Sequence, residues 1–187
     1  MNTAILDLFW DEAGEGLFFT GPDNEALIVR TKDIQDGALP SGNSVAVLNL
    51  LRLGRMTGNI ELEEKADQLA RAFAGEIASY PVAYTQFLSA LDFMAGPSQE
   101  IVIAGNLAQE TTRAMIETIH RIFLPNKVLI FRQEGGGGDR LSAISPFPAT
   151  LQPAKDRPTV YLCEKYTCKV PIFNIEELKS ALVTKES

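Results

Sequence analysis

The chain has 187 residues, of which 45% are hydrophobic and 22% are charged. Its 17 basic and 24 acidic side chains give a net charge of −7 and a sequence pI near 4.8. The apolar fraction excludes a disordered chain, because it is sufficient to form a core. The acidic balance argues against a nucleic-acid partner, since it implies no basic face.

The distribution of charge also bears on membranes and on the cell compartment. No run of 18 residues lacks a charged side chain, so we expect neither a membrane span nor a membrane partner. The first residues lack the basic segment of a secretory signal, and two cysteines are too few for a disulfide-stapled secreted scaffold. We therefore expect a cytoplasmic protein.

The first hundred residues predict helices with short connections. Before the first of these helices, two apolar runs at 17–20 and 26–29 favour a small hairpin. Residues 45–56 carry apolar side chains around most of a helical circumference, which is typical of a helix buried on several sides. Ser41 and Asn43 precede this helix and are good N-cap residues, because their side-chain oxygens can accept from free backbone N–H groups.

A second helix is predicted at 61–80, with one apolar stripe and an opposite face rich in acidic side chains. Asn59 is placed to cap its first turn. This helix and the one before it form a predicted αα-hairpin, in which the inner helix is buried and the outer one is amphipathic. Pro81 suits the first turn of a third helix, which Gly96 and Pro97 end.

The pattern then changes to short β-branched runs. Residues 100–104 and 127–131 predict strands, and the amphipathic segment between them predicts a helix, so the three form a βαβ unit. The stretch 133–158 is rich in glycine and proline and is expected to be an irregular loop. Three further elements are predicted after it: strands at 159–163 and 169–173 and a helix at 175–183.

A polar cluster near the N-terminus is the candidate site for chemistry. It combines acidic, amide, hydroxyl and aromatic side chains in two predicted loops: Trp10, Asp11, Glu12, Asp36, Ser41 and Asn43. Paired carboxylates can act as acid and base on sugar protons, and aromatic rings stack on sugar faces. On this interpretation the three acidic residues are catalytic candidates, and the other three bind substrate. The alternative is that they are caps and turn residues of the buried helix.

Two cysteines, Cys163 and Cys168, flank a four-residue connection between two predicted strands. This placement allows their Cα atoms to come within disulfide reach, although the spacing differs from that of a thioredoxin-type redox motif. Three interpretations stay open: reduced or structural thiols, a reversible disulfide, or metal ligands. Because His120 is the sole histidine, a zinc site of the usual kind lacks ligands, so we predict no metal and no cofactor.

Several segments together resemble one protein family. They are Phe-Trp-Asp-Glu at 9–12, Gly-Leu-Phe-Phe-Thr at 16–20, Asp-Gly-Ala-Leu-Pro-Ser-Gly-Asn-Ser at 36–44, Phe-Leu-Pro-Asn-Lys at 123–127, and the cysteine pair before Pro171. They resemble the C-terminal region of the thioredoxin-domain-containing, spermatogenesis-associated protein family over nearly the whole chain. The Pro-Ser-Gly-Asn-Ser run and the cysteine pair are the most specific parts of this resemblance.

The resemblance implies a fold and a division of the chain. Members of that family carry an N-terminal thioredoxin-like domain and then an (α/α) toroid, which is similar to six-hairpin glycosidases and N-acylglucosamine 2-epimerases. We therefore expect a mainly α fold, in which residues 1–97 form helical hairpins of a partial toroid. Residues 98–187 are expected to form a small α/β appendage that contains the 133–158 loop. The thioredoxin-like domain and most toroid hairpins are expected to be missing.

The expected function is that of a structural or interaction part of such a toroid protein, not catalytic alone, with loops that could line a site for a carbohydrate-like ligand. The apolar helix at 45–56 is expected to be covered by a second copy of the chain or by the missing N-terminal domains. Two alternatives stay open. One is a carbohydrate-processing enzyme of the epimerase or glycosidase class that uses the acidic residues above, and the other is a thiol redox role through Cys163 and Cys168.

Overall fold

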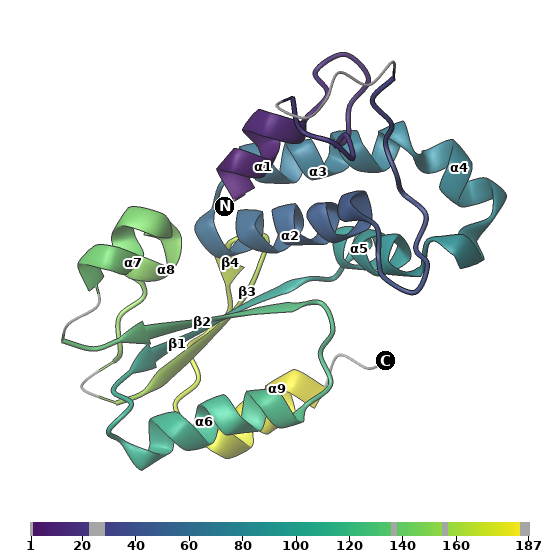
Figure 1. Cartoon of the computed structure of the whole chain (residues 1–187). Helices are drawn as coiled ribbons and strands as arrows, with labels where there is room; N and C mark the ends of the chain where they lie inside the picture. Colours follow the sequence, from purple (N-terminus) through teal and green to yellow (C-terminus); the bar gives the residue numbers. More distant parts are fainter. Residues whose placement is uncertain (1, 23–28, 136–137, 155–156, 184–187) are drawn as a thin grey trace. The chain divides into compact units, whose positions relative to one another are not determined.

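The computed structural model describes residues 2–22, 29–135, 138–154 and 157–183 (Figure 1). Contacts between Cα atoms group the chain into two compact units. The first unit comprises Met1–Gly54 and Asn59–Gly96, and the second comprises Arg55–Gly58 and Pro97–Ser187. The short stretch at residues 55–58, which includes the last residues of one long helix, thus belongs to the second unit.

The described part of the first unit is helical. Its elements in chain order are α1 (Asn2–Phe9), α2 (Gly42–Thr57), α3 (Ile60–Ala72), α4 (Ala74–Ser79), a 3-10 turn (Pro81–Ala83) and α5 (Thr85–Ala95). The predicted helix at 61–80 is divided at Phe73, whose φ and ψ of −108° and 4° leave the helical region. Phe73 packs edge-on against Phe87 of α5 with ring centroids 6.5 Å apart, so the break lets an aromatic side chain enter the core.

The α2–α3 pair confirms one local prediction and shows a close approach at Gly54. Asn59 caps α3, because its side-chain oxygen accepts a hydrogen bond from the Glu61 N–H at 2.9 Å. Gly54, near the end of α2, leaves no room for a side chain beside α3. A Cβ atom at this position would lie 2.6 Å from Cγ of Glu63 and 3.2 Å from the carbonyl oxygen of Asn59. A larger residue at position 54 would therefore push α3 away.

The second unit is built on a four-stranded mixed sheet. Its strands are β1 (Gln99–Gly105), β2 (Lys127–Gln133), β3 (Thr159–Glu164) and β4 (Thr167–Cys168), in the order β2-β1-β3-β4. β1 runs parallel to β2 and antiparallel to β3, and β3 is antiparallel to β4. The crossover helix α6 (Glu110–Arg121) joins β1 to β2, which confirms the predicted βαβ unit. β4 lies slightly before the strand predicted at 169–173.

Helices α6 and α9 (Ile175–Val183) lie side by side against one face of this sheet (Figure 1). Alternate strand residues point into the resulting core, as the two-residue period of a strand requires. The core is formed mainly by Ile101, Ile103, Met115, Ile119, Val160, Leu162, Leu178 and Leu182. All seven residues of β1 are buried, and β1 has a neighbouring strand on each side.

The expected mainly α fold, a partial (α/α) toroid, is wrong, because the chain has an α/β fold with a four-stranded mixed sheet. The βαβ segment is not a small appendage to helical hairpins. Its strands join β3 and β4 in one sheet that carries its own hydrophobic core. Sequence periodicity detects single strands but not their lateral pairing, and the pairing of β3 with β1 is what completes the sheet.

One of two further expectations, the irregular loop at 133–158, also differs from the structure. The described residues of 133–158 include two short helices, α7 (Gly138–Ile144) and α8 (Pro146–Thr150). The second half of the hairpin predicted at 17–20 and 26–29 lies almost wholly outside the described residues. Leu17 forms an antiparallel bridge with Trp10, and the N–H of Phe19 donates to the carbonyl oxygen of Thr31 at 2.8 Å, so the hairpin stays a prediction.

Candidate functional site

The first unit holds an apolar pocket of about 470 Å³. Its walls come from α1, from residues 17–19 and from the first half of α2. Its few polar lining residues are Asp33, Asn49 and two of the predicted substrate-binding residues, Ser41 and Asn43. A hollow of this size with mainly apolar walls is typical of a binding site for an apolar group.

Residue spacing on two helices explains the pocket. α1 contributes Ile5, Leu6 and Phe9, which share one face of the helix. The lining residues of α2 at positions 42, 45, 46, 49 and 50 follow the i, i+3, i+4, i+7, i+8 pattern of a single stripe. Val45 is 39% exposed, so this side of α2 is open to solvent, whereas Val47 on another side is fully buried.

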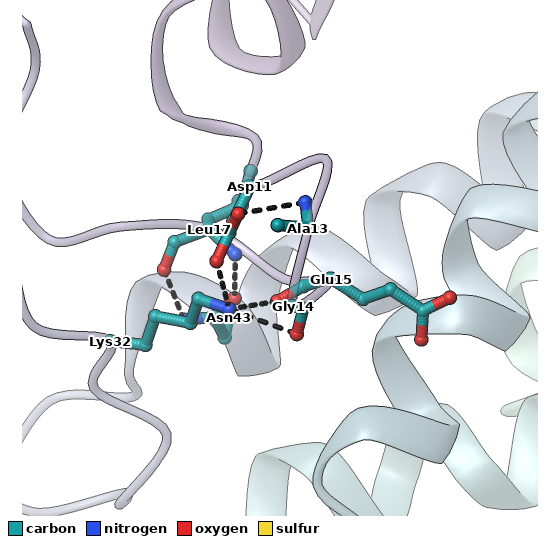
Figure 2. Close-up of polar contacts among 7 residues, drawn as sticks. All are labelled: Asp11, Ala13, Gly14, Glu15, Leu17, Lys32 and Asn43. Carbon is teal, nitrogen blue, oxygen red and sulfur yellow. Dashed lines mark hydrogen bonds and ion pairs between the residues drawn. The ribbon is translucent and has the colours of Figure 1, made fainter.

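Asp11 forms an ion pair with Lys32, whose Nζ lies 2.8 Å from the carboxylate Oδ2 (Figure 2). The same ammonium group donates hydrogen bonds to the carbonyl oxygens of Gly14, at 2.9 Å, and Glu15. The N–H of Ala13 donates to Oδ1 of Asp11 at 3.0 Å. The hydrogen bond from Lys32, and then that from Ala13, lowers the pKa of Asp11 below its usual value. Asp11 is therefore held as an anion at neutral pH.

Asn43 joins α2 to two loop segments of the first unit. Its side-chain oxygen accepts a hydrogen bond from the N–H of Leu17 at 2.7 Å. Its amide nitrogen donates to the carbonyl oxygens of Leu17, at 2.9 Å, and Asp33, at 2.8 Å. The side chain is buried, so these bonds satisfy polar groups that water cannot reach. Asn43 thus ties one wall of the pocket to α2.

Asp36 and Ser41 act as helix caps. Oδ2 of Asp36 accepts hydrogen bonds from the N–H groups of Gln86, at 2.8 Å, and Phe87, at 3.2 Å, in the first turn of α5. Oδ1 accepts from the N–H of Ser41 at 2.9 Å. The hydroxyl of Ser41 in turn accepts from the N–H of Ser44 at 3.0 Å, which confirms the predicted N-cap of α2.

Trp10 and Glu12 both lie near one lysine of α3. The ammonium of Lys65 lies 4.2 Å from the centre of the Trp10 ring, in a cation–π contact. The same group is 3.6 Å from the Glu12 carboxylate, which is itself exposed. One face of the indole ring is therefore covered by a cation. The three candidate carboxylates have separate partners: Lys32 for Asp11, Lys65 for Glu12 and backbone N–H groups for Asp36.

The second unit holds the other predicted site, the cysteine pair. Cys163 of β3 and Cys168 of β4 lie directly opposite each other, with Cα atoms 3.9 Å apart, and are joined by a disulfide. Of the three interpretations left open by the sequence, this geometry matches the disulfide. Within the described residues, no group of three or more histidine, cysteine or acidic side chains is arranged to hold a metal ion.

Sequence reasoning missed two features of these sites. Lys32, the partner of Asp11, is a single lysine in an irregular segment, and no local pattern marks it. Glu100 is fully buried in β1 and pairs in register with Cys163 of β3. The only sequence signal for it was an acidic residue at the start of an apolar run. None of the described helices is both long and apolar enough to cross a membrane.

The fold and these sites define an α/β protein whose sheet-containing unit carries a disulfide and whose helical unit carries an apolar pocket. The chain is similar to spermatogenesis-associated protein 20 of Homo sapiens and of Rattus norvegicus. Each is 39% identical to it over 176 residues, which cover 94% of this chain and 22% of the relative.

An uncharacterized protein of Caenorhabditis elegans is 30% identical over 171 residues, which cover 91% of this chain and 23% of that protein. No family model matches the chain. The matched segment covers 22% of the human protein and 22% of the rat protein, so the chain spans about a fifth of the length of these curated relatives.

Proposed function

We propose that the chain is a structural and interaction part of a longer protein related to spermatogenesis-associated protein 20, and that it is not catalytic by itself. The observation that carries this proposal is the open apolar pocket of α1 and α2. Its walls offer apolar side chains, and a contiguous apolar surface on a folded protein commonly marks an interaction site. The similarity to a segment of much longer proteins supports the same proposal.

The polar side chains around the pocket support a binding role over a carbohydrate-processing one. A general acid or base must be free to exchange a proton with a substrate. Asp11 is ion-paired with Lys32, and both oxygens of Asp36 accept backbone hydrogen bonds. A sugar ring that stacked on the face of Trp10 covered by Lys65 would have to displace that lysine. The candidate acidic side chains are thus engaged within the fold, and none of them lines the pocket.

In the purified chain, we propose that the pocket is covered by a second copy. The stripe on α2 that includes Val45 lies open, and burying apolar area against an identical stripe would give an isologous dimer. Each square ångström of apolar surface removed from water contributes about 25 cal/mol, and the area buried must be large enough for this gain to exceed the entropic cost of association. In a longer protein, another segment of the chain would take the same place.

Light scattering on the purified chain, combined with binding of a hydrophobic dye, tests this proposal. We expect a dimer, and we expect Val45→Asp to produce a monomer, because it puts a charge at the centre of the stripe. Leu88→Asp is the matched control. Leu88 is 37% exposed, close to the 39% of Val45, lies on α5 of the same unit and does not line the pocket. A wild-type monomer that binds no dye would contradict the proposal.

A thiol redox role is a second candidate function, favoured by the disulfide between Cys163 and Cys168. It concerns the second unit and is independent of the pocket. Mass spectrometry of the alkylated chain, prepared with and without reductant, tests it. We expect two alkylated cysteines only after reduction. Two free thiols under all conditions, including treatment with an oxidant, would remove this candidate.

A further inference from the structure

We infer that the β3–β4 hairpin is a thiol–disulfide exchange site, in which an external dithiol attacks the sulfur of Cys168 while Cys163 is the buried leaving group. This inference rests on the second candidate function, and it adds the direction of attack, the class of exchange partner and the survival of the fold in the reduced state. The observation that carries it is a row of three side chains, one from each of the strands β1, β3 and β4.

The row consists of Glu100, Cys163 and Cys168. Glu100 of β1 pairs in register with Cys163 of β3, which pairs in register with Cys168 of β4. Side chains directly opposite in antiparallel strands point to the same face of the sheet. This face is opposite to the one that carries Ile101 and Leu162, which belong to the hydrophobic core under α6 and α9. The two sulfurs therefore lie outside that core.

The two cysteines differ in access to solvent. Cys163 is 1% exposed, in a strand with neighbours on both sides, whereas Cys168 is only half-buried, in the strand at the edge of the sheet. Exchange begins with attack by a thiolate along the S–S axis, and the rate at each sulfur depends on its access to the attacking thiolate as well as on the leaving group. Cys168 is therefore the sulfur that an external thiolate reaches first, and Cys163 is the one released.

The turn between the two strands is held from outside the hairpin. Lys165 and Tyr166 join β3 to β4 with φ values of 48° and 63°, in the left-handed region that side chains other than glycine rarely adopt. The N–H of Tyr166 donates to Oε2 of the buried Glu100 at 3.2 Å. The Tyr166 ring also packs edge-on against Phe147 of α8, with centroids 5.7 Å apart. Glu100 is thus a positioning residue, because it fixes the turn that places Cys168 opposite Cys163.

The hairpin does not depend on the disulfide alone. The N–H of Lys169 donates to the carbonyl oxygen of Leu162 at 2.9 Å. Val160 and Ile172 exchange two further backbone hydrogen bonds, each of 2.9 Å. These bonds continue the pairing beyond the cysteines, so the strands stay in register when the S–S bond is broken. The reduced thiols remain opposite each other and can close again.

The exchange balances with a dithiol as the partner. One thiolate of the dithiol attacks Sγ of Cys168 to form a mixed disulfide, and Cys163 leaves as a thiolate that takes a proton from water. The second thiol of the partner, once it has lost its proton, attacks the partner's own sulfur in the mixed disulfide. Cys168 leaves and is protonated, and the partner is released as a disulfide. Two electrons and two protons pass to the protein, and the reverse sequence reoxidises it.

A redox titration of the full chain with reduced and oxidised dithiothreitol tests whether exchange occurs in the folded state. The thiols are quenched by alkylation and counted by mass spectrometry, and circular dichroism follows the fold. We expect a reversible two-electron transition with an unchanged circular dichroism spectrum. A disulfide that is reduced only when a denaturant is added, or a reduced chain that has lost its secondary structure, would overturn the inference.

The direction of attack is tested on the reduced wild-type chain and on two single variants. We expect iodoacetamide to label Cys168 at least about tenfold faster than Cys163 in the folded wild-type chain, because buried thiols react slowly. Likewise, Cys163→Ser should form a mixed disulfide with oxidised glutathione at least about tenfold faster than Cys168→Ser. Equal rates, or faster reaction of Cys163, would overturn the direction while leaving the second candidate function intact. Two thiols that never form a disulfide would remove both.

Discussion

The polar groups of the helical unit and those of the sheet unit are used in different ways. In the helical unit, Asp36 caps α5, and Asn43 binds backbone groups of the irregular segments at Leu17 and Asp33 and so holds a wall of the pocket in place. In the sheet, Glu100 and Cys163 are aligned by strand register. The comparison teaches that polar residues close together in the sequence, such as Asp36 and Asn43, stabilise the fold. The row proposed for thiol exchange, in contrast, is assembled from separate strands.

The strongest test of this contrast is Asn43→Ala. It removes three hydrogen bonds and leaves both backbone groups of the buried Leu17, and the carbonyl oxygen of Asp33, without this partner. We expect the free energy of unfolding to fall by about 2–4 kcal/mol, measured by urea denaturation. Asn49→Ala is the matched control, because Asn49 is exposed on the same helix, and it should change stability by less than about 0.5 kcal/mol. Similar losses in both variants would mean that Asn43 does not hold the wall.

Asp36→Ala should have the next largest effect on the helical unit. It removes the acceptor for the first turn of α5 and for the N–H of Ser41. We expect a loss of about 1–2 kcal/mol in the free energy of unfolding, as for other helix caps. Asp7→Ala, at an exposed position of α1, is the control and should change the free energy of unfolding far less. If Asp36→Asn bound a sugar less well than wild type while keeping its stability, the carboxylate would have a role beyond capping.

In the sheet unit, Glu100→Gln tests whether the buried carboxylate holds the turn between β3 and β4. The amide keeps an oxygen that can accept from the Tyr166 N–H, but without the charge that strengthens this bond. We expect the turn to be held less firmly, so that the equilibrium constant for reduction by dithiothreitol rises by about threefold to tenfold. Thiol counting in dithiothreitol buffers measures it. An unchanged constant would show that Glu100 does not position the turn.

The smallest effect concerns Asp11. Because the folded state lowers its pKa below the value of 3.8 that is usual for an aspartate, its charge contributes stability at neutral pH. That contribution is complete above the unfolded pKa and is lost as the pH falls through the lower folded pKa. We therefore expect acid unfolding of the wild-type chain to be steeper below about pH 4 than that of Lys32→Met. Parallel pH profiles would show that the ion pair adds nothing measurable.

Local patterns in the sequence were sufficient for elements whose signal is local. The caps at Ser41 and Asn59, the apolar helix α2 and the βαβ unit were all predicted, since each depends on residues close in the chain. The pairing of β3 with β1 depends on residues about sixty positions apart, and no periodicity reveals it. For that reason the sheet was mistaken for an appendage, and Glu100 was not connected with the cysteines.

The candidate site was predictable to a lesser degree. The sequence correctly marked Ser41 as a cap, yet Asp36 caps a helix that begins some fifty residues later, which only the folded chain shows. No local sequence pattern marks Lys32 as the partner of Asp11. The apolar pocket arises because stripes on two helices face each other, and their mutual orientation is a property of packing rather than of either stripe.

The short length of β4 limits aggregation through the edge of the sheet. A long edge strand offers a row of free N–H and C=O groups on which a second molecule can add a strand, which is a common route to aggregation. β4 has only two residues, Thr167 and Cys168, and the exposed charge of Lys169 follows directly. The exposed side chain of Val170 therefore lies beyond the end of the strand. This edge of the sheet is protected against pairing with another chain by its length and by the lysine that follows it.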